Sequence, residues 1–104
     1  MDALSALADP TRRRIVELLG RGERAVGEIV EEFEVSAPAI SQHLKALRDA
    51  GLVRVRVDAQ RRFYALDPAG LQEIDAWLAR VRRFWAPRLD ALERELRKPT
   101  RRKR

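Results

Sequence analysis

Three polar side chains that can read nucleic-acid bases, Ser41, Gln42 and Lys45, stand close together in the chain. Their hydroxyl, amide and ammonium groups all donate hydrogen bonds, and the hydroxyl and amide also accept them. Base edges in the major groove of DNA offer matching donors and acceptors together with the thymine methyl group. No carboxylate occurs between Ser36 and Lys45 to repel a nucleic acid. These residues could therefore hydrogen-bond to base edges.

A second group with binding chemistry consists of four arginines on either side of one turn, at residues 58–61. Guanidinium groups pair with phosphate oxygens and can enter the minor groove. Such arginines could also be merely solvated, but their concentration around one turn favours contact with DNA. The turn also carries an amide side chain. The residues of this group are Arg54, Arg56, Gln60, Arg61 and Arg62.

The sequence holds no set of residues that suggests catalysis. It has no cysteine, no His–Ser pair, no glycine-rich phosphate loop and no H-E-x-x-H motif. Zinc and arsenic(III) favour thiolate or imidazole ligands, and the only histidine is His43. Carboxylates of the last helix make a poor transition-metal site without histidine: Glu73, Asp75, Asp90 and Glu93. We expect no enzymatic activity, no metal and no cofactor.

The base-reading residues are predicted to lie on an amphipathic helix. Ser36 can cap its start, and Pro38 fits the first turn, where a missing N–H costs little. Gly51 suits the position after the last turn. The buried stripe has spacings of four and three, with Ile40, Leu44 and Leu47 as its members.

A β-hairpin is predicted to follow that helix. Residues 52–58 alternate valine with arginine, the period of a half-buried strand in which Val53, Val55 and Val57 face inward. A second strand covers residues 62–66. The connecting turn lacks glycine, so we expect it to be looser or longer than usual.

Three further helices are predicted ahead of the base-reading helix. One runs from Asp9-Pro10 to Leu19, with a short helix at residues 2–8 before it. Arg12, Arg13 and Arg14 near its start either pair with acids such as Glu17 or reach a phosphate. The next helix, residues 25–33, is joined to the base-reading helix by a turn at residues 34–36, which is the helix-turn-helix arrangement. Its expected buried residues are Val26, Ile29, Val30 and Phe33.

The last helix is predicted from Asp67-Pro68 to Leu96, with a kink or break near Phe84 caused by Pro87. Its apolar stripe is too long for this small body to cover, so we favour a two-fold dimer interface over an intramolecular core. Trp77, Phe84 and Trp85 could alternatively line an effector pocket. The expected interface residues are Leu4, Leu7, Leu71, Ile74, Leu78, Val81, Trp85, Leu89 and Leu92.

Charge is strongly segregated along the 104 residues. Residues 1–93 hold 15 basic and 15 acidic residues, so the whole net charge of +6 comes from residues 94–104. Within the body, residues 23–34 carry a net −4, whereas residues 36–62 carry a net +4. Positive charge therefore coincides with the predicted DNA-binding elements.

The remaining composition is that of one small domain. Hydrophobic residues make up 45% of the chain, enough for a small core that a partner subunit would help to stabilise. No apolar run is long enough for a membrane span, and the N-terminus does not resemble a signal peptide. With no cysteine as well, we expect a cytoplasmic protein with no membrane partner.

Several segments together resemble the ArsR/SmtB family of bacterial winged-helix repressors. They are ALADPTRRRIVELL (residues 6–19), VGEIVEEFEVSAPAISQHLKALRDAGLV (26–53) and RRFYALDP (61–68), within a match that covers about residues 4–96. The most specific part is the run S-x-H-L-x-x-L-x-x-A-G-L-V at residues 41–53. The ending VRRFWAPRLDALERELRK is more similar to the branch of the family that does not sense metals.

The resemblance implies a homodimer, built from the first and last helices, that binds an imperfect palindrome near its own promoter and represses it. The family's recognition-helix positions fall on Ser36, Ala37, Pro38, Ser41, Gln42 and Lys45, with His43 at the edge of that face. Its wing positions fall on Arg54, Arg56, Gln60, Arg61 and Arg62. The chain departs from the family's metal sensors in lacking their cysteine and histidine ligands.

We therefore predict a mainly α fold with a small β-hairpin, a winged helix-turn-helix that dimerises through its first and last helices. Residues 1–96 would form the domain, and residues 97–104 a disordered basic tail. The expected function is a sequence-specific transcriptional regulator that partners with double-stranded DNA and with itself. A winged-helix protein-interaction module and a nonspecific architectural DNA binder are the alternatives. The sequence does not decide whether the protein has a small-molecule effector.

Overall fold

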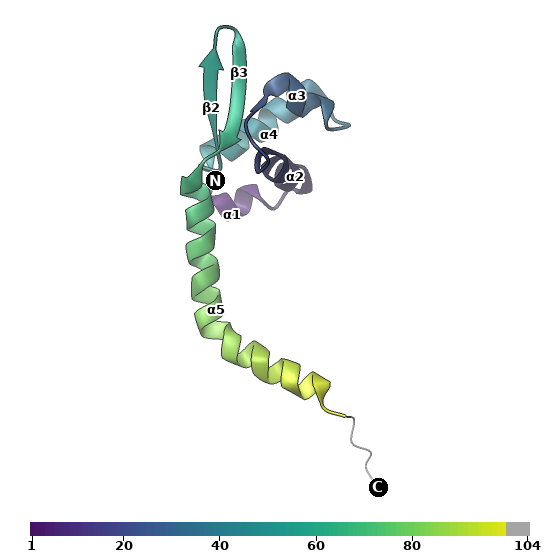
Figure 1. Ribbon diagram of the computed structural model, residues 1–104, viewed down its shortest axis with the longest axis vertical. Helices are drawn as coiled ribbons and strands as arrows, with labels where there is room; N and C mark the ends of the chain where they lie inside the picture. The colour runs from purple at the N-terminus through teal and green to yellow at the C-terminus, as the bar shows by residue number, and fades with distance from the viewer. Residues whose placement is uncertain (100–104) are drawn as a thin grey trace. The chain divides into compact units, whose positions relative to one another are not determined.

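The computed structural model describes residues 1–99 and confirms the predicted winged helix-turn-helix. The chain divides into two compact units, Met1–Ile74 and a second unit that begins at Asp75. The elements are α1 (Ala3–Ala6), α2 (Pro10–Leu19), β1 (Arg24–Ala25), α3 (Val26–Glu31), α4 (Ala37–Asp49), β2 (Val53–Asp58), β3 (Arg61–Leu66) and α5 (Pro68–Arg97) (Figure 1).

Helix ends are fixed by the residues that the sequence suggested. The Asp9 carboxylate accepts hydrogen bonds from the backbone N–H groups of Thr11 and Arg12, at 2.7 and 3.2 Å, and so caps α2. The Ser36 hydroxyl accepts from the N–H of Ala39 at 3.2 Å and caps α4. At the other end of α4, Gly51 adopts a left-handed φ of 76°, which satisfies the last carbonyls in a Schellman motif.

The helix α3 is shorter than predicted. It ends at Glu31, so the expected helix over residues 25–33 is wrong at its C-terminal end, and the turn before α4 is longer than the three residues expected. The N–H of Phe33 bonds to the carbonyl of Val30 at 3.2 Å, a tighter turn than an α-helix allows. Ile29 is fully buried, whereas Val26, Val30 and Phe33 are only partly buried against the core.

The sheet has one strand that the sequence analysis missed. β1 is only two residues long and pairs antiparallel with β3, giving the strand order β1-β3-β2. Two residues cannot show an alternating pattern, so the strand has no sequence signal of its own. Its effect is to attach the start of α3 to the hairpin.

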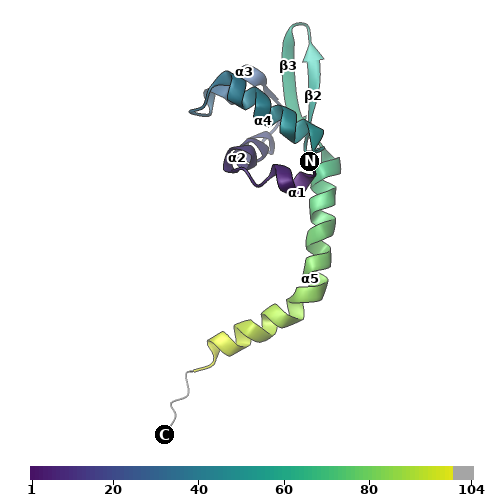
Figure 2. The same ribbon diagram turned by 180° about the vertical axis from the view of Figure 1, so that it is seen from behind.

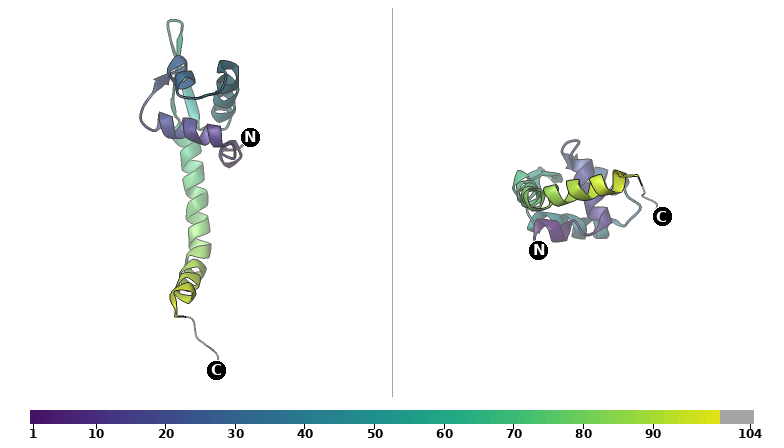
Figure 3. Two further views of the ribbon diagram at one scale, coloured as in Figure 1. Left: turned by 90° about the vertical axis from the view of Figure 1, so that its right-hand side faces the viewer. Right: turned by 90° about the horizontal axis from the view of Figure 1, so that it is seen from below.

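The hairpin differs from the prediction at its tip. β2 ends at Asp58 and β3 begins at Arg61, so the turn is tight, and the expected looser turn is wrong. Ala59 supplies the left-handed φ of 55° that glycine usually provides. The hairpin extends beyond the helices (Figure 1; Figure 3, left), which leaves Val57 64% exposed rather than half-buried as predicted.

The core of the first unit forms where α2, α3 and α4 meet the base of the hairpin. Its largest fully buried side chains are Ile15, Ile29, Ile40, Leu44, Leu47, Leu52 and Val53. Leu7, Leu71 and Ile74 pack against this cluster. Three of the nine residues expected at a dimer interface therefore contribute at least part of their surface to the protein's own core.

The helix α5 continues through Pro87 without a break. Proline removes one backbone hydrogen bond and crowds the preceding turn, and within the second unit the helix bends near this residue (Figure 1). α5 includes Arg97, which pairs with Glu93 at 2.8 Å, so the helix runs one residue past the expected domain end. Residues 100–104 of the expected disordered tail lie outside the described residues.

Candidate nucleic-acid interface

One face of α4 carries most of the side chains predicted to read DNA. Ser41, Gln42 and Lys45 are exposed, as are Ser36, Ala37 and Pro38 at the start of the helix. This placement follows from the buried stripe of Ile40, Leu44 and Leu47, which turns the opposite face of the helix outward. The polar side chains of Ser41, Gln42 and Lys45 are therefore free to form hydrogen bonds with base edges.

His43 lies apart from that face. Its imidazole is partly buried, and Nδ1 accepts a hydrogen bond from Nε of Arg12 at 3.2 Å. The histidine therefore connects α4 to the start of α2 and has a structural partner within the protein. Burial alone would raise the pKa of Asp9, but backbone hydrogen bonds from Arg12 and Thr11 and the positive charge of Arg12 lower it.

The arginines of the hairpin do not share one surface. In the register of β2 and β3, Arg62 lies opposite Val57, and Tyr64 lies opposite Val55. Alternate residues of a strand point to opposite faces, so Arg62 stands on the face of Tyr64, whereas Arg54, Arg56 and Arg61 stand on the other. Sequence reasoning grouped these arginines without separating the two faces. Gln60 is exposed at the tip of the hairpin.

Arg56 is already engaged inside the protein. Its Nε and Nη2 donate to the two carboxylate oxygens of Glu23 at 3.1 and 2.8 Å, and Asp58 lies 3.6 Å away. Its guanidinium also lies 4.5 Å from the ring centroid of Phe63. The hydrogen bond from Arg56 lowers the pKa of Glu23, and the same bond raises the pKa of Arg56. Two carboxylates thus balance the charge of this arginine.

A hollow of about 530 Å³ lies between α4 and the hairpin. Figure 2 shows the arrangement that creates it, with the hairpin rising from the C-terminal end of α4. Ser41, Lys45 and Arg62, three of the predicted DNA-binding residues, come together here. The hollow also contains three residues that the sequence analysis did not select, Arg48, Asp49 and Tyr64. Helical spacing could have identified Arg48, because it follows Ser41 by two turns.

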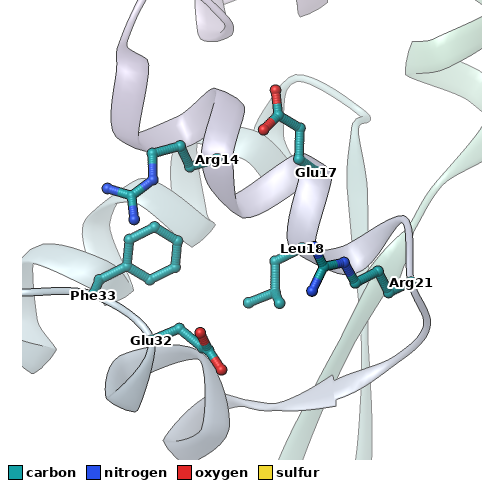
Figure 4. A pocket seen from close by; sticks show the side chains of 6 residues that line it. All are labelled: Arg14, Glu17, Leu18, Arg21, Glu32 and Phe33. Atoms are coloured by element: carbon teal, nitrogen blue, oxygen red, sulfur yellow. The ribbon is translucent and has the colours of Figure 1, made fainter.

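The three arginines at the start of α2 have partners within the protein. Arg12 bonds to His43, and Nη1 of Arg13 donates to the carbonyl of Leu7 at 2.9 Å. The guanidinium of Arg14 lies 4.8 Å from the ring centroid of Phe33 (Figure 4). These contacts explain where the three arginines lie. Neither an ion pair with Glu17 nor a contact with a DNA phosphate, the two roles predicted from the sequence, is needed for that.

Arg14 and Phe33 line a second hollow, of about 160 Å³, between α2 and the residues after α3 (Figure 4). Ligand pockets usually enclose about 300–1,000 Å³, so this hollow is small for an effector. Among residues 1–99, no group of three or more histidine, cysteine, aspartate or glutamate side chains is placed to hold a metal ion. Within the same residues, no helix has the length and apolar character needed to cross a membrane.

Comparison with known proteins places this geometry in a family. Residues 9–55 match the family described as bacterial regulatory protein, arsR family. The chain is 52% identical over 83 residues to the HTH-type transcriptional regulator Rv2034 of Mycobacterium tuberculosis, covering 80% of this chain and 75% of the relative. It is 36% identical over 77 residues to the transcriptional repressor SdpR of Bacillus subtilis, covering 74% and 86%.

Solved structures agree with the sequence comparisons. One is the crystal structure of a possible transcriptional regulator for arsenical resistance. It matches this chain with a TM-score of 0.77 and 42% sequence identity, over 97% of this chain and 99% of the other. An ArsR-like transcriptional regulator from Rhodococcus sp. RHA1 has a TM-score of 0.69 and 30% identity, with 93% and 91% covered. The chain belongs to the ArsR family and is a DNA-binding transcriptional regulator rather than an enzyme.

Proposed function

We propose that this protein is a homodimeric repressor that binds a palindromic operator, with α4 in the major groove and the hairpin at the backbone or in the minor groove. The observation that carries the proposal is the exposed polar face of α4, on which Ser41, Gln42 and Lys45 lie beside the hollow that contains Arg62. The name of SdpR, a transcriptional repressor, favours repression over activation.

In this proposal, α4 is the element that reads the base edges directly. A major groove about 12 Å wide admits one helix, and the hydrophobic side of α4 is fully occupied by the core, which leaves only its polar face for a partner. Gln42 is suited to a bidentate contact with adenine. Ser41 and the first-turn residues Ser36, Ala37 and Pro38 would contact neighbouring bases or their backbone.

Dimer formation is assigned to the apolar residues of α5 together with α1. Two copies related by a two-fold axis would present two copies of α4 to two half-sites about one helical turn, or a multiple of it, apart. This spacing is the feature that distinguishes an operator-binding repressor from an architectural DNA binder, because architectural binding requires only charge.

The decisive experiment is fluorescence anisotropy across a salt series. The full-length protein is titrated with its own upstream DNA and with a scrambled duplex of equal length. We expect the upstream DNA to bind at least ~10³-fold tighter at physiological salt, as specific regulators do. Equal, weak binding of both duplexes with a steep salt dependence would instead indicate a nonspecific binder. Absence of DNA binding would favour a protein-interaction module.

Gln42 provides the test of direct readout. Gln42→Ala should weaken operator binding by roughly 1–3 kcal/mol and relax the preference at one base position, because one bidentate contact is lost. Gln72→Ala, the same change on an exposed residue of α5, is the matched control. An equal loss on operator and scrambled DNA would remove Gln42 from the base-reading residues.

A further inference from the structure

The hollow between α4 and the hairpin concentrates positive charge in a concave surface. Lys45 and Arg48 come from α4, and Arg62 comes from β3, whereas Asp49 is the only carboxylate among residues 1–99 that lines it. Three cations against one anion leave an excess of two positive charges. Lys45 is the cation that Asp49 balances, with Nζ and Oδ2 2.9 Å apart. Among residues 1–99, no ion pair involves Arg48 or Arg62.

The other lining groups are suited to a phosphate. The hydroxyl of Ser41 can donate a hydrogen bond to an anionic oxygen, and Tyr64 also lines the hollow with a phenol. Two guanidinium groups from different elements can each offer paired donors to phosphate oxygens. Because Ser41 and Lys45 also belong to the base-reading face of α4, an anion in the hollow would be continuous with a DNA strand on that face.

We propose that this hollow binds one backbone phosphate of the DNA, held jointly by Arg48 and Arg62, and that Asp49 opposes this phosphate and keeps its binding weak. The inference rests on the proposed function and adds two residues to it, Arg48 as a phosphate ligand and Asp49 as a built-in competitor. The phosphate contact fixes the position of the DNA strand between α4 and the hairpin.

The position of Asp49 is not explained by the stability of α4. It is the last residue of the helix, where the macrodipole disfavours negative charge. The pair with Lys45 has the acid on the C-terminal side, the weaker of the two orientations. Both side chains are largely exposed, at 77% and 57%, and exposed pairs contribute little to stability. A carboxylate beside a phosphate site does, however, lower the affinity for every DNA sequence alike.

The shared phosphate site can be tested with operator duplexes in which a single phosphate is replaced by a neutral methylphosphonate. For the wild-type protein, one such replacement per half-site should weaken binding about three- to tenfold, the size of a charge interaction near a surface. Arg48→Gln and Arg62→Gln should each reduce this sensitivity, and both should do so at the same phosphate. Arg21→Gln, which removes a charge from the separate hollow that Arg14 and Phe33 line, should leave the pattern unchanged.

Two results would overturn the shared site. Either both variants keep the wild-type pattern, or they lose sensitivity at two different phosphates. Because wild-type binding to the unmodified operator is measured in the same titrations, these results are separate from a failure of the proposed function, in which that binding is itself nonspecific. Inorganic phosphate added at constant ionic strength should not saturate the hollow below millimolar concentration. Saturable binding there, followed by amide chemical shifts, would instead indicate a site for a free anion.

Asp49 gives a test in which binding improves, so that misfolding cannot imitate the result. Asp49→Asn should tighten binding to operator and scrambled duplexes by the same factor, roughly three- to tenfold at low salt, and less as salt rises. Asp90→Asn, at an exposed residue of α5 that is not among the lining residues of the hollow, is the control for net charge. An unchanged affinity for both duplexes would show that the carboxylate does not face the DNA.

Discussion

The arginines around the turn of the hairpin differ in what the folded protein already does with them. Arg62 lines the hollow with no carboxylate partner among residues 1–99, whereas Arg56 bonds to both oxygens of Glu23 and lies near Asp58. A cation that is balanced inside the protein releases fewer counterions from DNA, because its charge is largely compensated before binding. Arg62 and Arg56 are therefore expected to contribute unequally to DNA binding, although both are arginines.

Replacing each of these two arginines should separate their roles. Arg62→Ala should weaken binding to all sequences and reduce the slope of log K against log salt by about one. Arg56→Ala should leave the slope close to the wild-type value. Anisotropy titrations at four or five salt concentrations measure both slopes. If the Arg56 variant lost as much slope as the Arg62 variant, Arg56 would exchange Glu23 for a phosphate on binding.

Asp9 makes the folding stability depend on pH. Its pKa is lowered in the folded protein, so it contributes stability above its unfolded pKa near 3.8, and that contribution is lost as pH falls through the lower, folded value. Asp9→Ala should lower the unfolding free energy by about 1 kcal/mol at pH 7, as the loss of an N-cap does. Asp9→Asn keeps a capping oxygen without the charge.

Urea unfolding of the three proteins between pH 7 and pH 2.5 tests this role of Asp9. The advantage of the wild-type protein over Asp9→Asn should shrink as the pH falls below about 4, where the carboxylate takes up a proton. An advantage that stayed constant across this range would mean that the charge of Asp9 adds nothing to the cap.

At the scale of elements, α4 and α5 are joined by a close backbone contact between two glycines. The N–H of Gly70, in the first turn of α5, donates to the carbonyl of Gly51 at 2.8 Å. A Cβ on Gly70 would lie 2.5 Å from that oxygen, closer than real Cβ atoms approach. The absence of a side chain at Gly70 therefore allows α5 to start directly against the end of α4.

Gly70→Ala should lower the unfolding free energy by about 1–3 kcal/mol, the usual cost of overpacking, because backbone atoms must move apart. Gly27→Ala is the matched control, since a Cβ on Gly27, within α3, would meet nothing within 4 Å. That change should be neutral or stabilise by up to about 1 kcal/mol. Urea denaturation of both variants measures the difference, and equal stabilities would contradict the importance of the glycine contact.

Elements with a long periodic pattern were predictable from the sequence, and those determined by tertiary contacts were not. α4 was identified from its cap, its stripe and Gly51, all of which are local signals. β1 exists only because β3 lies beside it. The tight turn at Ala59 depends on a strained φ, which cannot be predicted from the residue types in the turn. In the candidate site, Ser41, Lys45 and Arg62 were predicted and helical spacing could have identified Arg48, whereas Asp49 required the hairpin to be in place.

At the scale of the whole molecule, α5 carries apolar side chains that its own unit leaves exposed. Phe84 is 59% exposed, Trp85 45% and Leu89 57%. Phe84 and Trp85 make an edge-to-face contact, with ring centroids 5.0 Å apart, so they form a single aromatic surface. Exposed apolar patches on this scale usually mark an interface, which supports α5 as the dimer contact of the proposed repressor.

Trp85→Ala should weaken that dimer, because a large aromatic side chain near the middle of an interface often contributes 2 kcal/mol or more, roughly a thirtyfold change in the dissociation constant. Arg83→Ala is the control, since two residues along a helix place Arg83 on the opposite face. Sedimentation velocity across a concentration series measures both constants. A wild-type protein that stays monomeric, or a Trp85 variant with the wild-type constant, would contradict the interface. Because a monomer reaches only one half-site, the same variant should also lose most of its preference for the full operator.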